Sequence, residues 1–345
     1  MASSTDKSTV ANLTKQLPIA SRLVSITEVK KMLSDQVPLL GVVDYGGVSS
    51  ELPFGTVPVI SVELPQLDSN PLIEIWTSDS PATYGQNSGI SFAKNDQVLF
   101  GCISVEYGNS LEATTYSTYK NLLSFLTNSD YPHLLRMWNY FPAIHQEDDG
   151  LDRYKQFCIG RAKAFTEHHL SPTNRYPAAT VIGTIGGQLI VYFIASHEPG
   201  LQSENPRQVS AYRYPEQYGP TSPSFSRAIL KRWQNGQQLY ISGTASIVGH
   251  ASQHQNELAN QLKEIFNNLN SLLEHVRVTY GLEAGLNSIS PLKVYIRNPS
   301  QLNEIKNRIK QIIDSEKHIL YLQGNICRSD LLLEIEGLLS VCFDQ

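Results

Sequence analysis

Residues 95–126 read NDQVLFGCISVEYGNSLEATTYSTYKNLLSFL, and residues 235–266 read NGQQLYISGTASIVGHASQHQNELANQLKEIF. The two stretches align without a gap at an offset of 140 residues, with Asn95 opposite Asn235 and Phe100 opposite Tyr240. Each has the pattern of a strand, a connection and an amphipathic helix. Identity is low, so chance similarity is the alternative, but the agreement in pattern as well as in residues favours an internal duplication. The sequence therefore predicts an α/β fold with mixed α+β sheets, made of two similar halves.

The duplication suggests a division of the chain into three parts. Residues 1–20 are polar and rich in Ser and Thr, and we expect a flexible arm there. An N-terminal α/β domain is expected over 21–150, with a first strand near 37–43, and a C-terminal α/β domain over 151–345.

Local patterns are clearer in the second part. Gly186-Gly187 separates two apolar runs, which predicts a β-hairpin. Residues 200–228 are rich in Pro and Tyr and carry no hydrophobic period, which predicts a long functional loop. The apolar stripe over 258–276 predicts a helix packed on a sheet, with the helices on one face of that sheet.

Length and composition limit the classes of function. The 345 residues correspond to about two domains. A net charge of −5 without a basic block disfavours nucleic acid and anionic membranes as partners. The longest apolar run, 189–195, is too short for a bilayer-spanning helix, which needs about 20 residues. The N-terminus lacks an apolar signal core and the four cysteines are scattered, so we expect a cytoplasmic protein with reduced thiols.

The C-terminal stretch Leu331–Gly337 carries two acids in an apolar strand pattern. Because side chains alternate along a strand, Glu334 and Glu336 share one face, roughly 7 Å apart. If that face is open to solvent, both acids are ordinary surface groups. If it lines a pocket, burial raises the pKa of a glutamic acid and makes it a proton donor.

Arginines and tyrosines gather in the irregular segments of the second part. Arginine suits bidentate capture of a carboxylate, although a surface ion pair is the usual role of a single arginine. Together with the nearby phenols they indicate an anionic, partly cyclic small molecule. His250 and His254, and the adjacent His168 and His169, lack a third ligand, so no metal site is predicted.

Several motifs in a fixed order resemble those of the chorismatases, most closely from about residue 150 onward. They are RYKQFCIGR at 153–161, NPRQVSAY at 205–212, YGP at 218–220, SGTAS at 242–246, YIRNP at 295–299 and CRSDLLLEIE at 327–336. The resemblance implies an enzyme without a cofactor that removes the enolpyruvyl group of chorismate as pyruvate. It also implies two halves of the YjgF-like, chorismate-mutase-like fold.

The resemblance implies roles for individual residues. Glu334 matches the family's proton donor, which protonates the enol ether. Ala245 and Cys327 match positions that influence the product, and here they indicate 3- and/or 4-hydroxybenzoate. A thiol or thiolate at Cys327 would help to move a ring proton if nearby arginines lowered its pKa. The positions expected to hold the substrate are Tyr154, Arg161, Tyr212, Tyr218, Arg227, Gly243, Thr244 and Arg297, with Arg161 and Arg297 on the two carboxylates and Arg153 as a further candidate.

Two other functions stay open at the level of sequence. A YjgF-like imine or enamine deaminase would use Arg297 or Arg328 as a carboxylate anchor and Glu334 for proton transfer. A non-catalytic sensor of aromatic acids would keep only the pocket. The sequence leaves the oligomeric state open. We favour a monomer, because fused halves can form the site within one chain.

Overall fold

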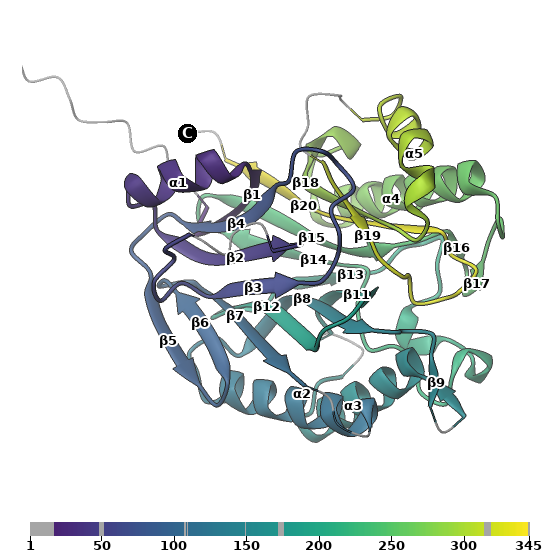
Figure 1. The fold of residues 1–345 in the computed structure, drawn as a ribbon, viewed down its shortest axis with the longest axis horizontal. Coiled ribbons are helices and arrows are strands. Elements are labelled where there is room, and N and C mark those ends of the chain that lie inside the picture. Colours follow the sequence, from purple (N-terminus) through teal and green to yellow (C-terminus); the bar gives the residue numbers. More distant parts are fainter. Residues whose placement is uncertain are drawn as a thin grey trace, which may run out of the picture.

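The computed structural model describes residues 17–47, 52–106, 108, 110–148, 150–171, 176–313 and 319–343. Three β-sheets surround one core, and helices cover the outer faces of the two larger sheets (Figure 1). Residues 1–16 of the arm predicted over 1–20 lie outside the described residues. The predicted end of the arm at residue 20 is wrong, because Leu17 and Ile19 are buried and a strand begins at Ile19.

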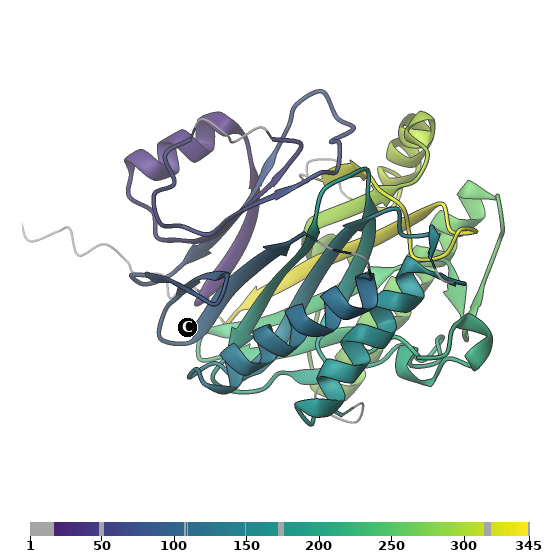
Figure 2. The same cartoon turned by 60° about the horizontal axis from the view of Figure 1, so that its bottom comes forward.

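The first large sheet has the strand order β11-β8-β12-β7-β6-β5. Only β11 and β8 are parallel, and two helices, α2 and α3, lie side by side across the outer face (Figure 2). The apolar sides of these helices form a second core with that face. The elements are β5 (Thr83–Asn87), β6 (Ile90–Lys94), β7 (Val98–Val105), α2 (Leu111–Thr127), β8 (His133–Pro142), α3 (Arg153–Glu167), β11 (Ala178–Thr184) and β12 (Leu189–Ser196).

The second large sheet repeats this arrangement. Its order, β19-β18-β20-β15-β14-β13, matches the first sheet position by position, and β19 and β18 are again the parallel pair. The predicted helices over its outer face are present as α4 and α5. The elements are β13 (Leu201–Ser203), β14 (Ala228–Trp233), β15 (Gly236–Thr244), α4 (Leu258–Tyr280), β18 (Ile289–Ile296), α5 (Leu302–Ile309), β19 (Ile319–Gln323) and β20 (Leu333–Cys342).

The topology confirms the duplication, but the gapless alignment is wrong beyond the strand. Residues 106–110 connect β7 to α2, whereas residues 245–257 connect β15 to α4 and include the small strands β16 (Ile247–Val248) and β17 (Ala251–Ser252). The two helices are therefore equivalent in the fold without being equivalent at the offset of 140.

The predicted hairpin at Gly186-Gly187 is wrong. β11 and β12 are not neighbours, because β8 lies between them. The chain β8–α3–β11 is a parallel crossover, which places β11 on one side of β8, and β12 then returns antiparallel on the other side. A turn signal identifies a change of direction but not the strand that fills the next position in a sheet.

The expected boundary between residues 150 and 151 is wrong for the same reason. β11 and β12, assigned to the second part, complete the first sheet by pairing with β8 and β7. The two halves meet between Ser196 at the end of β12 and Leu201 at the start of β13.

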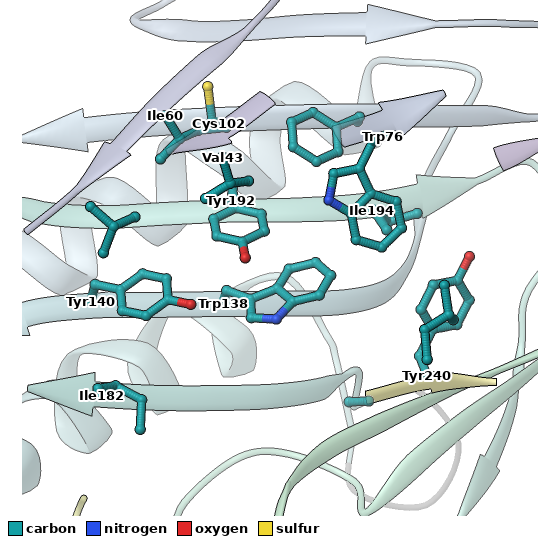
Figure 3. Close-up of a cluster of buried hydrophobic side chains, with 14 of the residues drawn as sticks. Val43, Ile60, Trp76, Cys102, Trp138, Tyr140, Ile182, Tyr192, Ile194 and Tyr240 are labelled. Carbon is teal, nitrogen blue, oxygen red and sulfur yellow. The ribbon is translucent and has the colours of Figure 1, made fainter. Parts of the chain in front are cut away.

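The N-terminal part forms a third, smaller sheet with the order β1-β4-β2-β3. The strand expected near 37–43 overlaps β2 (Leu39–Tyr45), but it is not the first strand of the chain, because β1 (Ile19–Val24) precedes it. The inner face of this sheet packs on both large sheets. Trp76 and Val43 lie in one core with Trp138 and Tyr192 of the first sheet and Tyr240 of the second (Figure 3). The elements are β1 (Ile19–Val24), α1 (Ile26–Ser34), β2 (Leu39–Tyr45), β3 (Val59–Val62) and β4 (Ile73–Ser78). In the described part of the chain, no helix combines the length and the apolar character needed to cross a membrane.

Candidate active site

A cavity of about 510 Å³ opens between the two large sheets and is lined by both halves of one chain. The walls come from α3 and β11 of the first half, from β15 and β20 of the second, and from the irregular segments that precede β14 and β20. The volume lies within the range of small-molecule sites, about 300–1,000 Å³.

Glu334 enters this cavity from β20 because of the pleat of the strand. Leu333 and Ile335 face outward into the core under α4 and α5, so Glu334 and Glu336 face inward, as the alternation predicts. Neither acid is a surface group, since they are only 5% and 1% exposed.

Gly243 of β15 makes room for the Glu334 carboxyl group. A Cβ atom at position 243 would lie 1.8 Å from Oε1 of Glu334 and 3.2 Å from Oγ1 of Thr180. The first distance is far inside van der Waals contact, so any side chain at position 243 would displace the carboxyl group.

Glu334 is protonated at neutral pH. Burial and, to a smaller extent, the neighbouring charge of Glu336 raise the pKa of its carboxyl group from 4.5 to about 8, against a partial opposing effect of Arg136 and Arg227. The cavity therefore holds a neutral carboxylic acid that can donate a proton.

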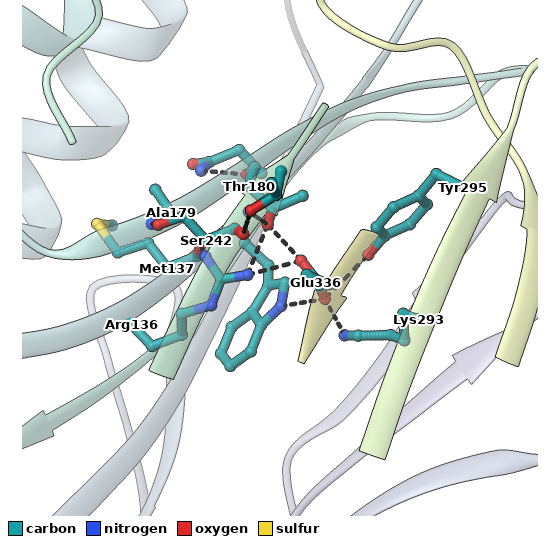
Figure 4. Close-up of polar contacts among 12 residues, drawn as sticks. Arg136, Met137, Ala179, Thr180, Ser242, Lys293, Tyr295 and Glu336 are labelled. Atoms are coloured by element: carbon teal, nitrogen blue, oxygen red, sulfur yellow. Dashed lines mark hydrogen bonds and ion pairs between the residues drawn. The ribbon is translucent and has the colours of Figure 1, made fainter. Parts of the chain in front are cut away.

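Glu336 has the opposite protonation state, because cations and hydrogen-bond donors surround its carboxylate (Figure 4). Arg136 Nη2 lies 2.6 Å from one of its carboxylate oxygens, and Lys293 Nζ lies 2.7 Å from the other. Trp138 Nε1 donates to the same carboxylate at 2.7 Å, and the hydroxyl groups of Thr180 and Tyr295 also donate. Burial alone would raise the pKa of Glu336, but Lys293 and Arg136 lower it below its usual value.

Two arginines that line the cavity form no close ion pair with an acid among the described residues, although the charge of Glu204 acts on Arg227. Arg328 stacks 3.9 Å from the ring centre of Tyr218, and its Nη1 donates to the His250 carbonyl at 2.9 Å. Arg227 donates through Nη2 to the Val209 carbonyl and to the Tyr214 hydroxyl, while its buried Nε has no partner in the described part of the chain. Two cations fixed by neutral groups form a site for an anion.

The structure brings together most of the positions that the sequence selects. The predicted site residues that line the cavity are Tyr154, Tyr218, Arg227, Gly243, Ala245, Cys327 and Glu334. Those that do not line it are Arg161, Tyr212, Thr244 and Arg297. Of these, Tyr212 packs edge-on against Tyr176, and the Thr244 hydroxyl donates to the Ser242 carbonyl. Arg153, the further candidate, pairs with Asp148 at 2.7 Å.

The two arginines expected to grip carboxylates lie elsewhere. Arg297 directs its guanidinium to the chain just before β20, where it donates to the carbonyls of Ile326, Arg328 and Ser329. Arg161 is 2% exposed on α3 and lies over the rings of Tyr119 and Phe165. Sequence motifs identify arginines but not the direction in which their long side chains extend.

Of the thiol or thiolate expected at Cys327, the surroundings favour the thiol. Burial and, to a smaller extent, the charge of Glu334 raise the pKa of the Cys327 thiol to about 12, and Arg328 only partly opposes this effect. Cys327 therefore lines the cavity as a neutral thiol.

Sequence reasoning missed the buried bases behind the acids. Arg136 and Lys293 are 1% and 3% exposed, and each interrupts an apolar strand, in Leu135-Arg136-Met137 and Leu292-Lys293-Val294. A single charge inside such a strand is the signal that would have found them. Thr180 of the cavity wall carried no comparable signal, whereas Tyr214 is one of the phenols expected near the arginines.

Comparison with known proteins shows the family. The model "Chorismatase FkbO/Hyg5-like, N-terminal" matches residues 74–195. A 3-hydroxybenzoate synthase of Streptomyces hygroscopicus is 32% identical over 315 residues, which cover 87% of this chain and 91% of the relative. A chorismatase of Streptomyces rapamycinicus is 32% identical over 88% of this chain and 92% of its own length.

A solved structure agrees with these relatives. The crystal structure of a chorismatase superposes with a TM-score of 0.85 at 30% identity, covering 93% of this chain and 98% of that one. The protein belongs to the chorismatase family. Among the described residues, no three His, Cys, Asp or Glu side chains are grouped so that they could hold a metal ion.

The buried acid predicts a pH-dependent stability. Glu334 ionises near 4.5 in the unfolded chain and near 8 in the folded protein, so stability is lost as the pH rises from about 4.5 through about 8. Gln cannot ionise and escapes this loss. Urea unfolding should show that Glu334→Gln stabilises the protein, with a gain that grows by roughly 3 kcal/mol between about pH 5 and pH 8. Parallel stability profiles of the two proteins would contradict a buried neutral acid.

Proposed function

We propose that this protein is a chorismatase that cleaves chorismate to pyruvate and a hydroxybenzoate. The observation that carries the proposal is a neutral Glu334 in a cavity that also contains two arginines which, in the described part of the chain, form no close ion pair. Chorismate has two carboxylates and an acid-labile enol ether, so its cleavage needs fixed cations and a proton donor. The full-length similarity to enzymes named chorismatase supports the same reaction.

Glu334 performs the first step. Its O–H bond breaks as a C–H bond forms at the terminal methylene of the enolpyruvyl group, and the side chain becomes an oxocarbenium ion. Breakage of the bond between the ring carbon and the ether oxygen then releases pyruvate. Loss of one ring proton makes the ring aromatic and balances the proton that Glu334 gave. Chorismate has the summed composition of pyruvate and hydroxybenzoate, so this route consumes no water.

Arg227 and Arg328 bind the two carboxylates in this proposal. Both line the cavity, and both approach Tyr214, at 5.8 and 5.2 Å from its ring centre. Arg297 acts indirectly: its hydrogen bonds to the carbonyls of residues 326, 328 and 329 hold the segment that carries Cys327 and Arg328. It is a positioning residue rather than an anion ligand.

We also propose that the enzyme works as a cytoplasmic monomer. One chain lines the cavity from both halves, and the inner faces of all three sheets are buried against one another. All four cysteines are free, which fits a reducing compartment.

Replacement of the proton donor should abolish turnover. Glu334→Gln keeps the shape and the space beside Gly243 but cannot protonate an enol ether, so pyruvate release should fall at least ~100-fold while chorismate still binds. A coupled pyruvate assay and a binding titration measure the two effects. Glu264→Gln, which changes a buried acid outside the cavity, is the control. A folded wild-type protein that releases no pyruvate would instead favour the deaminase or sensor alternatives.

Lysine substitutions should separate the roles of the arginines. Lys keeps the charge but loses the planar fork. Arg328→Lys and Arg227→Lys should each raise KM roughly tenfold with a smaller effect on kcat, because one bidentate contact of about 1.4 kcal/mol is lost. Arg297→Lys should instead lower thermal stability and reduce kcat through Cys327 and Arg328. If KM rose only in Arg297→Lys and not in the other two variants, Arg297 would instead be assigned as a ligand of a substrate carboxylate.

The nature of the product depends on Ala245 and Cys327. Both line the cavity together with Glu334, and we propose that they place the ring so that 3- and/or 4-hydroxybenzoate forms. Cys327→Ala should alter the ratio of the isomers more than the total pyruvate, and Ala245→Gly should favour the 3-isomer. Chromatography of the products with parallel pyruvate counting tests this. An unchanged ratio in both variants would remove the two residues from product selection without affecting the cleavage step.

A further inference from the structure

A row of buried charges runs from the N-terminal sheet to the wall of the cavity. Glu74 on β4, Lys293 on β18, Glu336 and Glu334 on β20 and Arg136 on β8 are each 5% exposed or less. Neither Glu74 nor Lys293 lines the cavity. Burial of so many charges on three different sheets is costly unless they are closely paired.

Lys293 joins the N-terminal sheet to the cavity wall. Its Nζ lies 3.0 Å from Glu74 Oε2 and 2.7 Å from Glu336 Oε1. It also donates to the hydroxyl groups of Tyr45 and Tyr192, at 3.2 and 3.1 Å. Glu74 accepts further hydrogen bonds from Tyr45 and Trp76, both on the N-terminal sheet. Every atom that approaches the ammonium group in this set is an acceptor, so the lysine stays charged.

The charges in this row balance without Glu334. Two carboxylates, Glu74 and Glu336, face two cations, Lys293 and Arg136. An ionised Glu334 would add a third negative charge to a neutral, buried set. The remaining groups that act on Glu334 are the cation Arg227 and the neutral thiol Cys327, and Arg227 is held by the Val209 carbonyl and the Tyr214 hydroxyl.

We propose that Glu74 and Lys293 are positioning residues: Glu74 keeps Lys293 charged, Lys293 keeps Glu336 ionised, and the negative charges of Glu336 and Glu74 together keep the neighbouring Glu334 carboxyl group in its protonated form. The N-terminal sheet has no counterpart in the duplicated halves. Through Glu74 on β4, it contributes one of the charges that control the protonation of Glu334. This inference rests on the proposed function only for its kinetic readout. The protonation of Glu334 is measurable without any substrate.

A purely structural role would not require these charges. Buried ion pairs replaced by apolar residues of similar volume often leave a fold unchanged or more stable. Lys293 (Figure 4) lies over the rings of Tyr45, Trp138 and Tyr192, an aromatic core in which an apolar side chain would pack. Their expected signature is therefore a shift in a pH profile rather than a loss of stability alone.

Two isosteric substitutions test the proposal. Removal of a negative charge near an acid favours its ionised form, so Glu334 should lose its proton at a lower pH. The alkaline limb of the kcat/KM profile should move toward acid by roughly one pH unit or more in Glu336→Gln, and by a smaller amount in Glu74→Gln, because Glu74 is more distant. The matched control is Glu264→Gln, a buried acid paired with Arg207 outside the cavity, which should leave the limb in place.

Infrared titration of the protonated carboxyl band gives the same quantity without chorismate. The band that disappears in Glu334→Gln identifies the group, and its midpoint should shift toward acid in the two variants. Such a shift in a protein that fails to cleave chorismate would support the network and overturn the proposed function. An unmoved midpoint in folded Glu74→Gln, or an equal shift in Glu264→Gln, would overturn the network. If Glu336→Gln does not fold, the midpoint measured in Glu74→Gln is sufficient to test the network.

Discussion

Two carboxyl groups two residues apart on β20 share one buried face, and the difference in their protonation is the constraint around which the protein is organised. The Glu336 carboxylate contacts two cations and accepts hydrogen bonds from three neutral donors. The Glu334 carboxyl group instead faces the cavity and lies beside Gly243. Like charges at this spacing in a medium of low dielectric cannot both persist. The ionised state of one residue therefore fixes the neutral state of the other. The groups that stabilise Glu336 come from β8, β11 and β18, so both large sheets contribute to the state of one acid.

The duplication explains where this site lies. Each half has an outer face covered by two helices and an inner face that must be buried, and the two inner faces are packed together with a third sheet. Polar groups can enter such a core only in balanced sets. The cavity opens where the walls of the two halves separate, and the long irregular segment before β14 contributes its tyrosines and Arg227 there. The site is therefore internal to one chain although it lies between two similar units.

The arginines show that two residues which contact the same segment of the chain can have different roles in the site. Arg297 and Arg328 both act at the segment that precedes β20, yet one hydrogen-bonds its backbone and the other points into the cavity. Each has four rotatable side-chain bonds, so a residue at the right place in a motif can direct its guanidinium to either side. Stacking on Tyr218 and a hydrogen bond to the His250 carbonyl hold Arg328 in its orientation. These partners come from remote segments of the chain.

Local periodicity in the amino-acid sequence was enough to predict several features of the fold and the site. The alternation in Leu333–Glu336 placed both acids on one face, the apolar stripe over 258–276 gave α4, and the repeated pattern gave the two halves. Tertiary structure alone decided that β8 separates β11 from β12, that Lys293 meets Glu74 and Glu336, and that the Cys327 thiol stays neutral. The difference lies in how far apart in the sequence the interacting residues are. The alternation of side chains along a strand is set by the backbone of a few neighbouring residues. Sheet neighbours, ion pairs and burial depend on which distant segments the folded chain brings together.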